Sequence, residues 1–346
     1  MTKEVKIGNI SIGSGNKVAI QSMLNKKPSD IDGNIEQAVN LEKAGCEINR
    51  VAIPNEAAIK LIPLIKKATI IPLVADIHFD YRLAIKSVEA GVDKIRFNPG
   101  NIGDDNKAKK VIDCCKAHSI PIRVGVNSGS LDKNILKKYN GITYDALVES
   151  AMHHVRLIED LGYDKIVISL KSSNLHTMTK AYRRISKITD YPLHLGVTEA
   201  GTLETGSLKS AIGIGSLLLD GIGDTIRVSL TDDPIREIEA AKTILKLLDM
   251  DDGVTVISCP TCGRTSIDIL SIAKEVEERT KDIKKRLKVA VMGCVVNGPG
   301  EAGDADLGIA GGVDSAVLFI NGKIVRKITE NYADELVKVV KEWEEK

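Results

Sequence analysis

The chain has 346 residues, of which 43% are hydrophobic and 3% aromatic, and its 48 Lys and Arg residues nearly balance its 47 Asp and Glu residues. The formal net charge of +1 gives no overall field for nucleic acid or a membrane surface, and few aromatic side chains are present for base stacking. The first residues lack the long apolar core of a signal peptide, and no segment approaches the roughly 20 apolar residues of a membrane-spanning helix. Six cysteines fit a reducing cytoplasm better than a disulfide framework. These features predict a cytoplasmic, soluble enzyme with no nucleic-acid or membrane partner.

A repeated pattern runs from residue 18 to about residue 231. Short apolar, β-branched runs alternate with stretches that place apolar residues at i, i+3, i+4 and i+7, as amphipathic helices do. The eight β runs are VAIQSM (18–23), INRVAIP (48–54), PLVADIHF (72–79), KIRFNPG (94–100), PIRVGVNSG (121–129), KIVISLKSS (165–173), PLHLGVTEAG (192–201) and TIRVSLT (225–231). This alternation favours a closed (β/α)8 TIM-type barrel, to which we assign residues 1–248. An open doubly wound sheet is the alternative, although no G-x-G-x-x-G pattern follows the first run.

Charged and amide side chains recur in these runs or directly after them. They are Arg50, Asp76, His78, Arg96, Asn98, Arg123, Asn127, Lys171, Glu199, Arg227 and Ser229. In a barrel the carboxyl ends of the strands converge on one mouth, where active sites lie. Five cations from five strands, with few acids beside them, are difficult to bury without an anion, and guanidinium groups match phosphate oxygens in bidentate geometry. We therefore expect a ligand with at least two phosphates, although any single arginine can instead belong to a buried structural ion pair.

The pattern changes after residue 231. A helix with Pro234 in its first turn closes the barrel, residues 249–253 form a linker, and residues 249–346 make a small α+β domain. In this domain we expect a strand into Cys259, a helix over about 266–287, a strand before Cys294, a hairpin turning at Asn321-Gly322, and a last helix from residue 332.

Three cysteines in the second domain have the spacing of metal ligands. Cys259 and Cys262 lie two residues apart, and Cys294 follows in a glycine-rich stretch whose nearest carboxylate is Glu301. Structural zinc usually takes four Cys or His ligands, and no His lies in this region. Three thiolates with one weaker ligand suit an iron–sulfur cluster that does chemistry at one iron. A Cys-x-x-Cys pair that is only buried or redox-active is the simpler alternative.

The chain resembles the 4-hydroxy-3-methylbut-2-enyl diphosphate synthase family of the methylerythritol phosphate route to isoprenoids, in its compact bacterial form. The resemblance covers essentially the whole chain. It rests on QSM, INRVAIP, VADIHFDYRLA, IRFNPGNIG, RVGVNSGSL, LGVTEAG, GIGDTIRVSLT, CPTCGR and MGCVVNGPGEA, in that order. One departure is that Leu24-Asn25-Lys26 follows QSM where the family usually has Thr-Asn-Thr, so a substrate contact from this loop is in question.

The resemblance implies a reaction, a cofactor and residue roles. The family opens the ring of 2-C-methyl-D-erythritol 2,4-cyclodiphosphate with two electrons and loss of water, and its electron donor is a flavodoxin or a ferredoxin. Its 4Fe-4S cluster would be held here by Cys259, Cys262, Cys294 and Glu301. The diphosphate would be bound by Arg50, Arg96, Arg123, Lys171 and Arg227, with Asn98, Asn127, Thr198 and Ser229 nearby. Glu199 would lie beside the substrate as a proton donor, Glu301 would be a catalytic ligand, and His78 matches a motif residue of open role.

The family also forms a head-to-tail homodimer in which each cluster domain covers the partner's barrel mouth. Two other functions remain as alternatives: a phosphosugar aldolase or isomerase barrel with a zinc-stabilised appendix, and an iron–sulfur sensor that binds a phosphorylated metabolite. The first needs zinc and no reductant, and the second binds its ligand without turnover.

Overall fold

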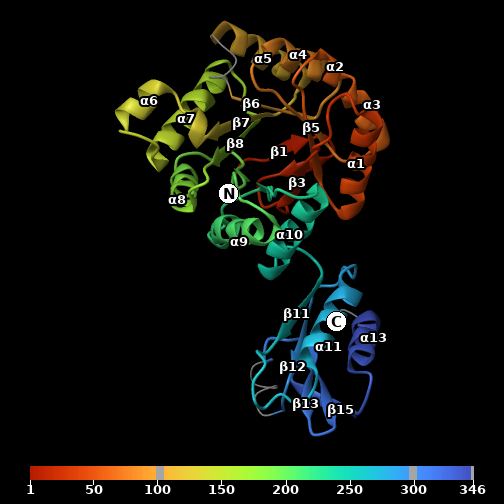
Figure 1. Cartoon of the computed structure of the whole chain (residues 1–346). Helices are drawn as coiled ribbons and strands as arrows, with labels where there is room; N and C mark the ends of the chain where they lie inside the picture. Colours follow the sequence, from red (N-terminus) through yellow and green to blue (C-terminus); the bar gives the residue numbers. More distant parts are fainter. Residues whose placement is uncertain (99–104, 296–301, 344–346) are drawn as a thin grey trace. The chain divides into compact units, whose positions relative to one another are not determined.

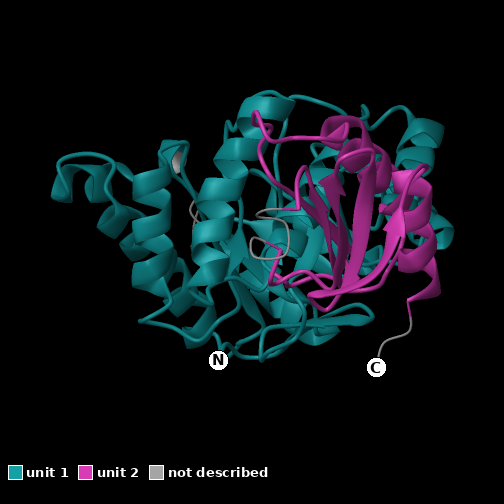
Figure 2. Ribbon diagram, turned by 90° about the horizontal axis from the view of Figure 1, so that it is seen from below, with its two compact units in different colours: residues 1–248 teal, residues 249–346 magenta. Residues whose placement is uncertain are grey.

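The computed structural model describes residues 1–98, 105–295 and 302–343, and the chain forms two compact units, residues 1–248 and 249–346 (Figures 1 and 2). In the first unit, eight parallel strands form one sheet in the order β8-β7-β6-β5-β4-β3-β10-β9. They are β3 (Ala19–Met23), β4 (Ile48–Ala52), β5 (Leu73–Asp76), β6 (Lys94–Phe97), β7 (Ile122–Asn127), β8 (Ile166–Lys171), β9 (His194–Leu195) and β10 (Thr225–Ile226). A parallel bridge between Ile168 and Leu193 joins the two ends of the sheet. The predicted barrel is therefore confirmed, with its last two strands shorter than their sequence runs.

Helices follow the strands and surround the barrel (Figure 1). They are α1 (Ile31–Ala44), α2 (Glu56–Ile59), α3 (Leu61–Ala68), α4 (Tyr81–Glu89), α5 (Asp105–His118), α6 (Lys133–Lys138), α7 (Tyr144–Asp160), α8 (Leu175–Ile185), α9 (Leu203–Leu219) and α10 (Pro234–Leu247), with a 3-10 turn at Ser128–Ser130. Many begin at a polar side chain that accepts a hydrogen bond from a first-turn amide, as Asp30, Thr143 and Asn174 do. None of the described helices has the length and apolarity to cross a membrane.

A hairpin that the sequence patterns did not predict lies before the barrel. Its strands β1 (Val5–Ile7) and β2 (Ile10–Ile12) pair antiparallel, and their buried side chains pack against Ala19, Ile48, Val74 and Val167 of four barrel strands. These contacts form an apolar layer inside one end of the barrel. Polar side chains in the interior consequently occur further along the strands.

The second unit is a five-stranded mixed sheet with helices packed on it. Its elements are β11 (Val254–Ser258), α11 (Ile269–Thr280), β12 (Leu287–Met292), β13 (Leu307–Gly312), β14 (Ser315–Ile320), β15 (Lys323–Ile328) and α13 (Tyr332–Glu342). Strands β11, β12 and β13 run parallel, and β14 and β15 continue antiparallel. Alternation of side chains along β12 buries Val289 and Val291 beneath α11 and α13, and Ala290 and Met292 on the other face. This arrangement confirms the predicted small α+β unit.

Two local predictions in this unit had different outcomes. The Asn321-Gly322 turn is confirmed, since both residues have positive φ, 48° and 72°, as a type I′ turn requires. The helix predicted over about 266–287 was too long, because α11 ends at Thr280. Leu287 is instead buried in the sheet as the first residue of β12, so the intervening residues must turn the chain back.

Candidate functional site

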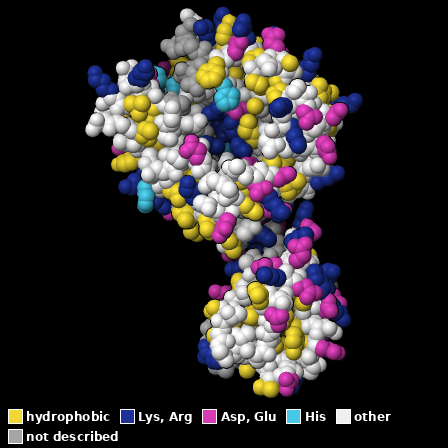
Figure 3. All heavy atoms as spheres, in the orientation of Figure 1, with side chains coloured by type: hydrophobic (Ala, Val, Ile, Leu, Met, Phe, Trp, Pro, Cys, Tyr) yellow, Lys and Arg dark blue, Asp and Glu magenta, His cyan; other side chains and the backbone are white. Residues whose placement is uncertain are grey.

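Basic side chains gather inside the barrel toward the carboxyl ends of its strands, and Figure 3 shows dark blue Lys and Arg atoms in a hollow of this unit. Arg50, Arg96 and Arg123 are buried, on β4, β6 and β7. Neighbouring strands place Arg96 opposite Arg123 and Asn127 opposite Lys171. A Cβ on Gly125 would lie 2.7 Å from Arg96 Nε, so this glycine gives the Arg96 side chain room to cross the interior.

Asp76, at the end of β5, joins two of these arginines. Its carboxylate accepts hydrogen bonds from Arg50 Nη2 at 2.5 Å and Arg96 Nη1 at 3.1 Å, and His78 Nε2 lies 3.3 Å away. Burial alone would raise the pKa of Asp76, but Arg50, His78 and Arg96 outweigh it and hold that pKa well below its usual range. The carboxylate is therefore ionised and fixes both guanidinium groups, a role that the sequence patterns did not assign.

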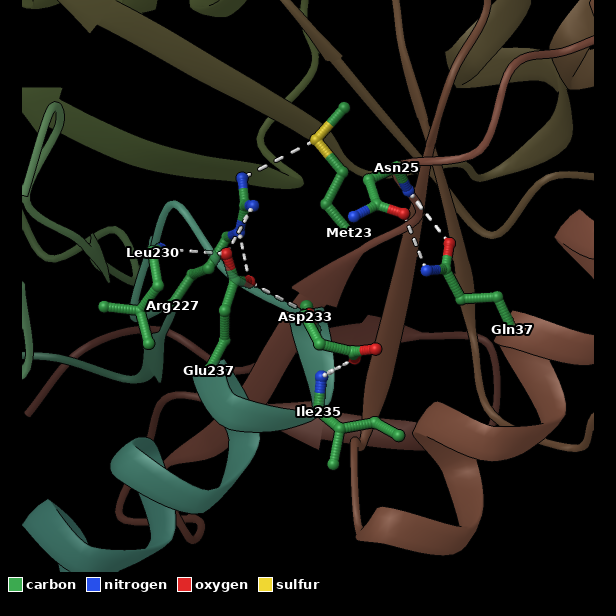
Figure 4. Close-up of polar contacts among 9 residues, drawn as sticks. Met23, Asn25, Gln37, Arg227, Leu230, Asp233, Ile235 and Glu237 are labelled. Atoms are coloured by element: carbon green, nitrogen blue, oxygen red, sulfur yellow. Dashed lines mark hydrogen bonds and ion pairs between the residues drawn. The ribbon is translucent and has the colours of Figure 1, made fainter. Parts of the chain in front are cut away.

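Arg227 is held by a second acid, Glu237 (Figure 4). Asp233 caps α10 and Pro234 follows, which places Glu237 in the first turn. Its carboxylate accepts from Arg227 Nε at 3.2 Å and Nη2 at 3.1 Å. Ser22 Oγ and the Leu230 amide donate to the same carboxylate at 3.0 and 3.1 Å. The expectation of few acids beside the cations was thus wrong for Arg50, Arg96 and Arg227, because Asp76 and Glu237 partly neutralise them.

Arg123 and Lys171 differ from these three arginines. Within the described chain, neither has an ion pair with an acid, and Arg123 Nε and Nη1 are buried without a hydrogen-bond partner. Burial, with repulsion from Arg123, Arg50, Arg227 and Arg96, holds the pKa of Lys171 well below its usual value. An anion entering the barrel would reverse that repulsion, so these two cations provide the strongest structural reason to expect an anionic ligand.

The other predicted barrel residues follow the same strands. Asn98 is buried just after β6 and Asn127 ends β7, whereas Thr198 and Ser229 lie half-buried beyond β9 and β10. Glu199 is exposed and has a φ of 53°, a left-handed conformation uncommon for a residue with a side chain. The barrel therefore brings the predicted residues to one end of its strands, with Glu199 at the outer limit and His78 half-exposed beside Asp76.

The loop after β3 carries the one departure from the family pattern. Leu24 is buried and its amide donates to Arg50 O at 2.9 Å. Asn25 and Gln37 exchange two hydrogen bonds, of 2.9 and 2.7 Å, which tie the loop to α1 (Figure 4). Lys26 is exposed. Leu24 and Asn25 thus have structural roles in this loop.

The cysteines of the second unit follow two adjacent parallel strands. Cys259 follows β11 directly, and Cys294 comes two residues after β12, which pairs with β11. The Gly293 amide donates to Cys259 Sγ at 3.2 Å, an N–H···S contact of the kind that tunes cluster sulfur. Hydrogen bonds from the backbone and side chain of Arg264 lower the pKa of the exposed Cys262 thiol.

These features fit an iron–sulfur group. Cys259 and Cys294 follow adjacent parallel strands at one edge of the sheet, and the lowered pKa of Cys262 favours its thiolate form. Glu301 lies outside the described residues, and the described part of the chain gathers no group of three or more His, Cys, Asp or Glu side chains as a metal site. The ligand set accordingly stays a prediction. The remaining cysteines, Cys46, Cys114 and Cys115, are on the barrel unit, where Cys46 and Cys115 are buried.

A TIM-type barrel whose interior carries a cluster of basic side chains, joined to a small thiol-bearing α+β unit, defines a two-unit enzyme of the TIM-barrel class. The chain belongs to the GcpE family: residues 2–242 match the GcpE TIM-barrel domain and residues 255–342 match the GcpE protein C-terminal domain. The family resemblance predicted from the motifs is thereby confirmed.

Curated relatives match over almost the full length. One from Caldanaerobacter subterraneus subsp. tengcongensis is 58% identical, covering 98% of this chain and 96% of its own, and one from Fusobacterium nucleatum subsp. nucleatum is 56% identical, covering 99% and 97%. Both are called 4-hydroxy-3-methylbut-2-en-1-yl diphosphate synthase (flavodoxin). Dihydropteroate synthase from Xanthomonas albilineans, solved with 7,8-dihydropteroate, is 14% identical with a TM-score of 0.52 and covers 71% of this chain and 98% of its own, which supports the barrel fold alone.

Proposed function

We propose that this chain catalyses the reductive ring opening and dehydration of 2-C-methyl-D-erythritol 2,4-cyclodiphosphate to 4-hydroxy-3-methylbut-2-enyl diphosphate. The observation that carries the proposal is family membership across both units, with relatives of this name more than 50% identical over almost the whole chain. The basic barrel interior supports it independently, since a diphosphate presents the oxygens that guanidinium groups bind in pairs.

The barrel residues would bind and orient the substrate. Arg50, Arg96, Arg123, Lys171 and Arg227 would contact the two phosphates, and Asn98, Asn127, Thr198 and Ser229 would donate hydrogen bonds to phosphate or hydroxyl oxygens. Asp76 and Glu237 hold three of the arginines at fixed positions, which lowers the entropy lost on binding. His78 would act through its contact with Asp76.

Glu199 is the proposed proton donor. Ring opening breaks a carbon–oxygen bond to phosphate, and dehydration breaks a second carbon–oxygen bond whose oxygen leaves as water. The net reaction consumes two electrons together with protons, and a carboxyl group near the leaving hydroxyl can deliver one of them. Glu199 is exposed after β9, where a bound substrate could reach its side chain.

The second unit would hold a 4Fe-4S cluster on Cys259, Cys262, Cys294 and Glu301. When bound, this group supplies electrons singly and an iron with Lewis acidity. A carboxylate ligand is harder and more easily displaced than a thiolate, so Glu301 would mark the iron that faces substrate. The Gly293 amide would orient the Cys259 sulfur.

The partners and compartment are also proposals. Flavodoxin, which the relatives' names specify, is the proposed electron donor, with a ferredoxin as the alternative. A head-to-tail homodimer agrees with exposed apolar residues spaced along α9, namely Leu208, Ile212 and Leu219. A reducing cytoplasm suits a protein in which none of the six cysteines forms a disulfide.

The experiment that tests this function is anaerobic turnover of the cyclodiphosphate by the full-length protein with reduced flavodoxin. The expected result is stoichiometric formation of 4-hydroxy-3-methylbut-2-enyl diphosphate, identified by mass spectrometry, and no reaction without reductant. Reaction without any reductant, or none with a fully iron-loaded protein and either donor, would contradict the proposal.

A further inference from the structure

The barrel interior also contains a set of buried polar side chains with atoms that lack hydrogen-bond partners in the described chain. Gln21, Lys94, Arg123 and His194 are each at most 1% exposed. Among the described residues, Lys94 Nζ, His194 Nε2, both polar atoms of the Gln21 side chain, and two nitrogens of Arg123 have no hydrogen-bond partner. Because an unpaired buried polar group is costly, such a concentration indicates a site that is completed by a ligand.

These four side chains face the barrel interior. Lys94 is two residues before Arg96 on β6, so strand alternation places both on the same face of the sheet. By the same alternation, Gln21 lies with Met23, whose sulfur contacts Arg227, and Arg123 lies with Gly125, over which Arg96 crosses. His194 pairs in register with Thr225, and its Nδ1 lies 2.8 Å from Thr225 Oγ1. Lys94 therefore lies below Arg96 on the interior face of β6.

Lys94 is surrounded mainly by positive charge. The charged and titratable groups that share the barrel interior with it are Arg50 on β4, Asp76 on β5, Arg96 on its own strand β6, Arg123 on β7, Lys171 on β8, His194 on β9 and Arg227 after β10. Burial, together with repulsion from Arg123 and Arg50, holds the pKa of Lys94 well below its usual value. Asp76 is the one acid among these groups, and its carboxylate already accepts hydrogen bonds from Arg50 and Arg96.

We propose that Lys94 is a further diphosphate-binding residue, whose buried and unpaired amine takes up one proton from solvent when the diphosphate enters. The inference rests on the proposed function and extends it to a fully buried residue below Arg96 on β6. No other bond changes in this step: the amine gains a proton, and the resulting ammonium is compensated by phosphate oxygens.

Proton uptake makes affinity depend on pH in a definite direction. The ligand raises the pKa of Lys94, so between the free and bound values each binding event consumes a proton and affinity falls as pH rises. Each phosphorus of the cyclic diphosphate carries one strongly acidic hydroxyl, so this ligand does not itself titrate near neutral pH. Protons taken up on binding must therefore come to the protein.

The test is calorimetric titration of the full-length, cluster-containing protein with the cyclodiphosphate in the absence of reductant, so that nothing turns over. Measurements in buffers of different ionisation enthalpy give the number of protons taken up. Lys94→Met, which removes the amine at similar volume, is compared with Lys67→Met, which removes an exposed lysine on α3. Lys94→Gln replaces the first variant if that one does not fold.

We expect the wild type and Lys67→Met to take up about one proton more than Lys94→Met, whose affinity should be about tenfold lower. Ligand-free Lys94→Met should unfold at or above the wild-type temperature, since the amine it loses was unpaired. Equal proton uptake by wild type and Lys94→Met would overturn the inference. Absence of any binding by the wild type would instead refute the proposed function.

Discussion

Asp76→Asn should destabilise the barrel unit, and its effect can be estimated from the contacts. The carboxylate is 1% exposed and holds Arg50 and Arg96, so removing its charge leaves two buried guanidinium groups with only an amide oxygen between them. Removing one partner of a buried ion pair costs about 3–5 kcal/mol, and we expect a loss of about 3 kcal/mol because asparagine still accepts one hydrogen bond. This corresponds to a decrease of roughly 6–12 °C in the unfolding temperature.

The assay is unfolding of the full-length protein by denaturant, monitored by a spectroscopic signal that reports on the barrel unit. Asp80→Asn is the control, since Asp80 pairs with Arg82 on the surface and should change the free energy of unfolding by less than about 1 kcal/mol. Because the pKa of Asp76 is depressed in the folded state, its contribution is present above the unfolded pKa of about 4 and is lost as pH falls through the folded value. Wild type should thus lose more stability than Asp76→Asn in strong acid. A loss below about 1 kcal/mol at neutral pH would refute the account of Asp76.

Three further substitutions test other parts of the account. Glu199→Gln should retain the cluster but slow turnover roughly 10²–10⁴-fold, whereas full activity would exclude a proton donor at this position. Glu237→Gln should reduce kcat/KM about tenfold, because Arg227 loses its charged anchor, and unchanged kinetics would show that the anchor is dispensable. Gly308→Ala should lower the free energy of unfolding of the second unit by about 1–3 kcal/mol, since its Cβ would lie 2.5 Å from Ala290 O. Gly215→Ala, whose Cβ meets nothing within 4 Å, should by comparison be neutral or stabilising.

The barrel could be predicted from the sequence because its strands are buried on both faces and alternate regularly with amphipathic helices. The end of α11 could not be predicted, because the charged residues after Thr280 continue a helical pattern. Leu287 becomes the first residue of β12 only through its pairing in the sheet. The β1–β2 hairpin was also missed, because two three-residue strands give too short an alternation to detect.

The site was only partly predictable for a related reason. Residues at strand ends can be assigned to one mouth by topology, which applied to Asp76, Asn127 and Lys171. Glu237 reaches Arg227 from a helix, and no periodic pattern connects the two positions. The position of Lys94 did indicate that it faces the barrel interior, since it precedes Arg96 by two residues and lies on the same face of β6. A lysine in an apolar strand is, however, easily assigned to the protein surface instead.

The most direct test of the central claim is iron and acid-labile sulfide analysis of protein purified without air, with its absorption spectrum before and after dithionite. The account predicts about four irons and four sulfides per chain and a visible absorption that the reductant bleaches. Cys262→Ser should lose both metal and turnover, while Cys114→Ser, on α5 of the barrel unit, should keep both. Zinc in place of iron, with no sulfide, or full iron content and turnover in Cys262→Ser, would contradict the claim.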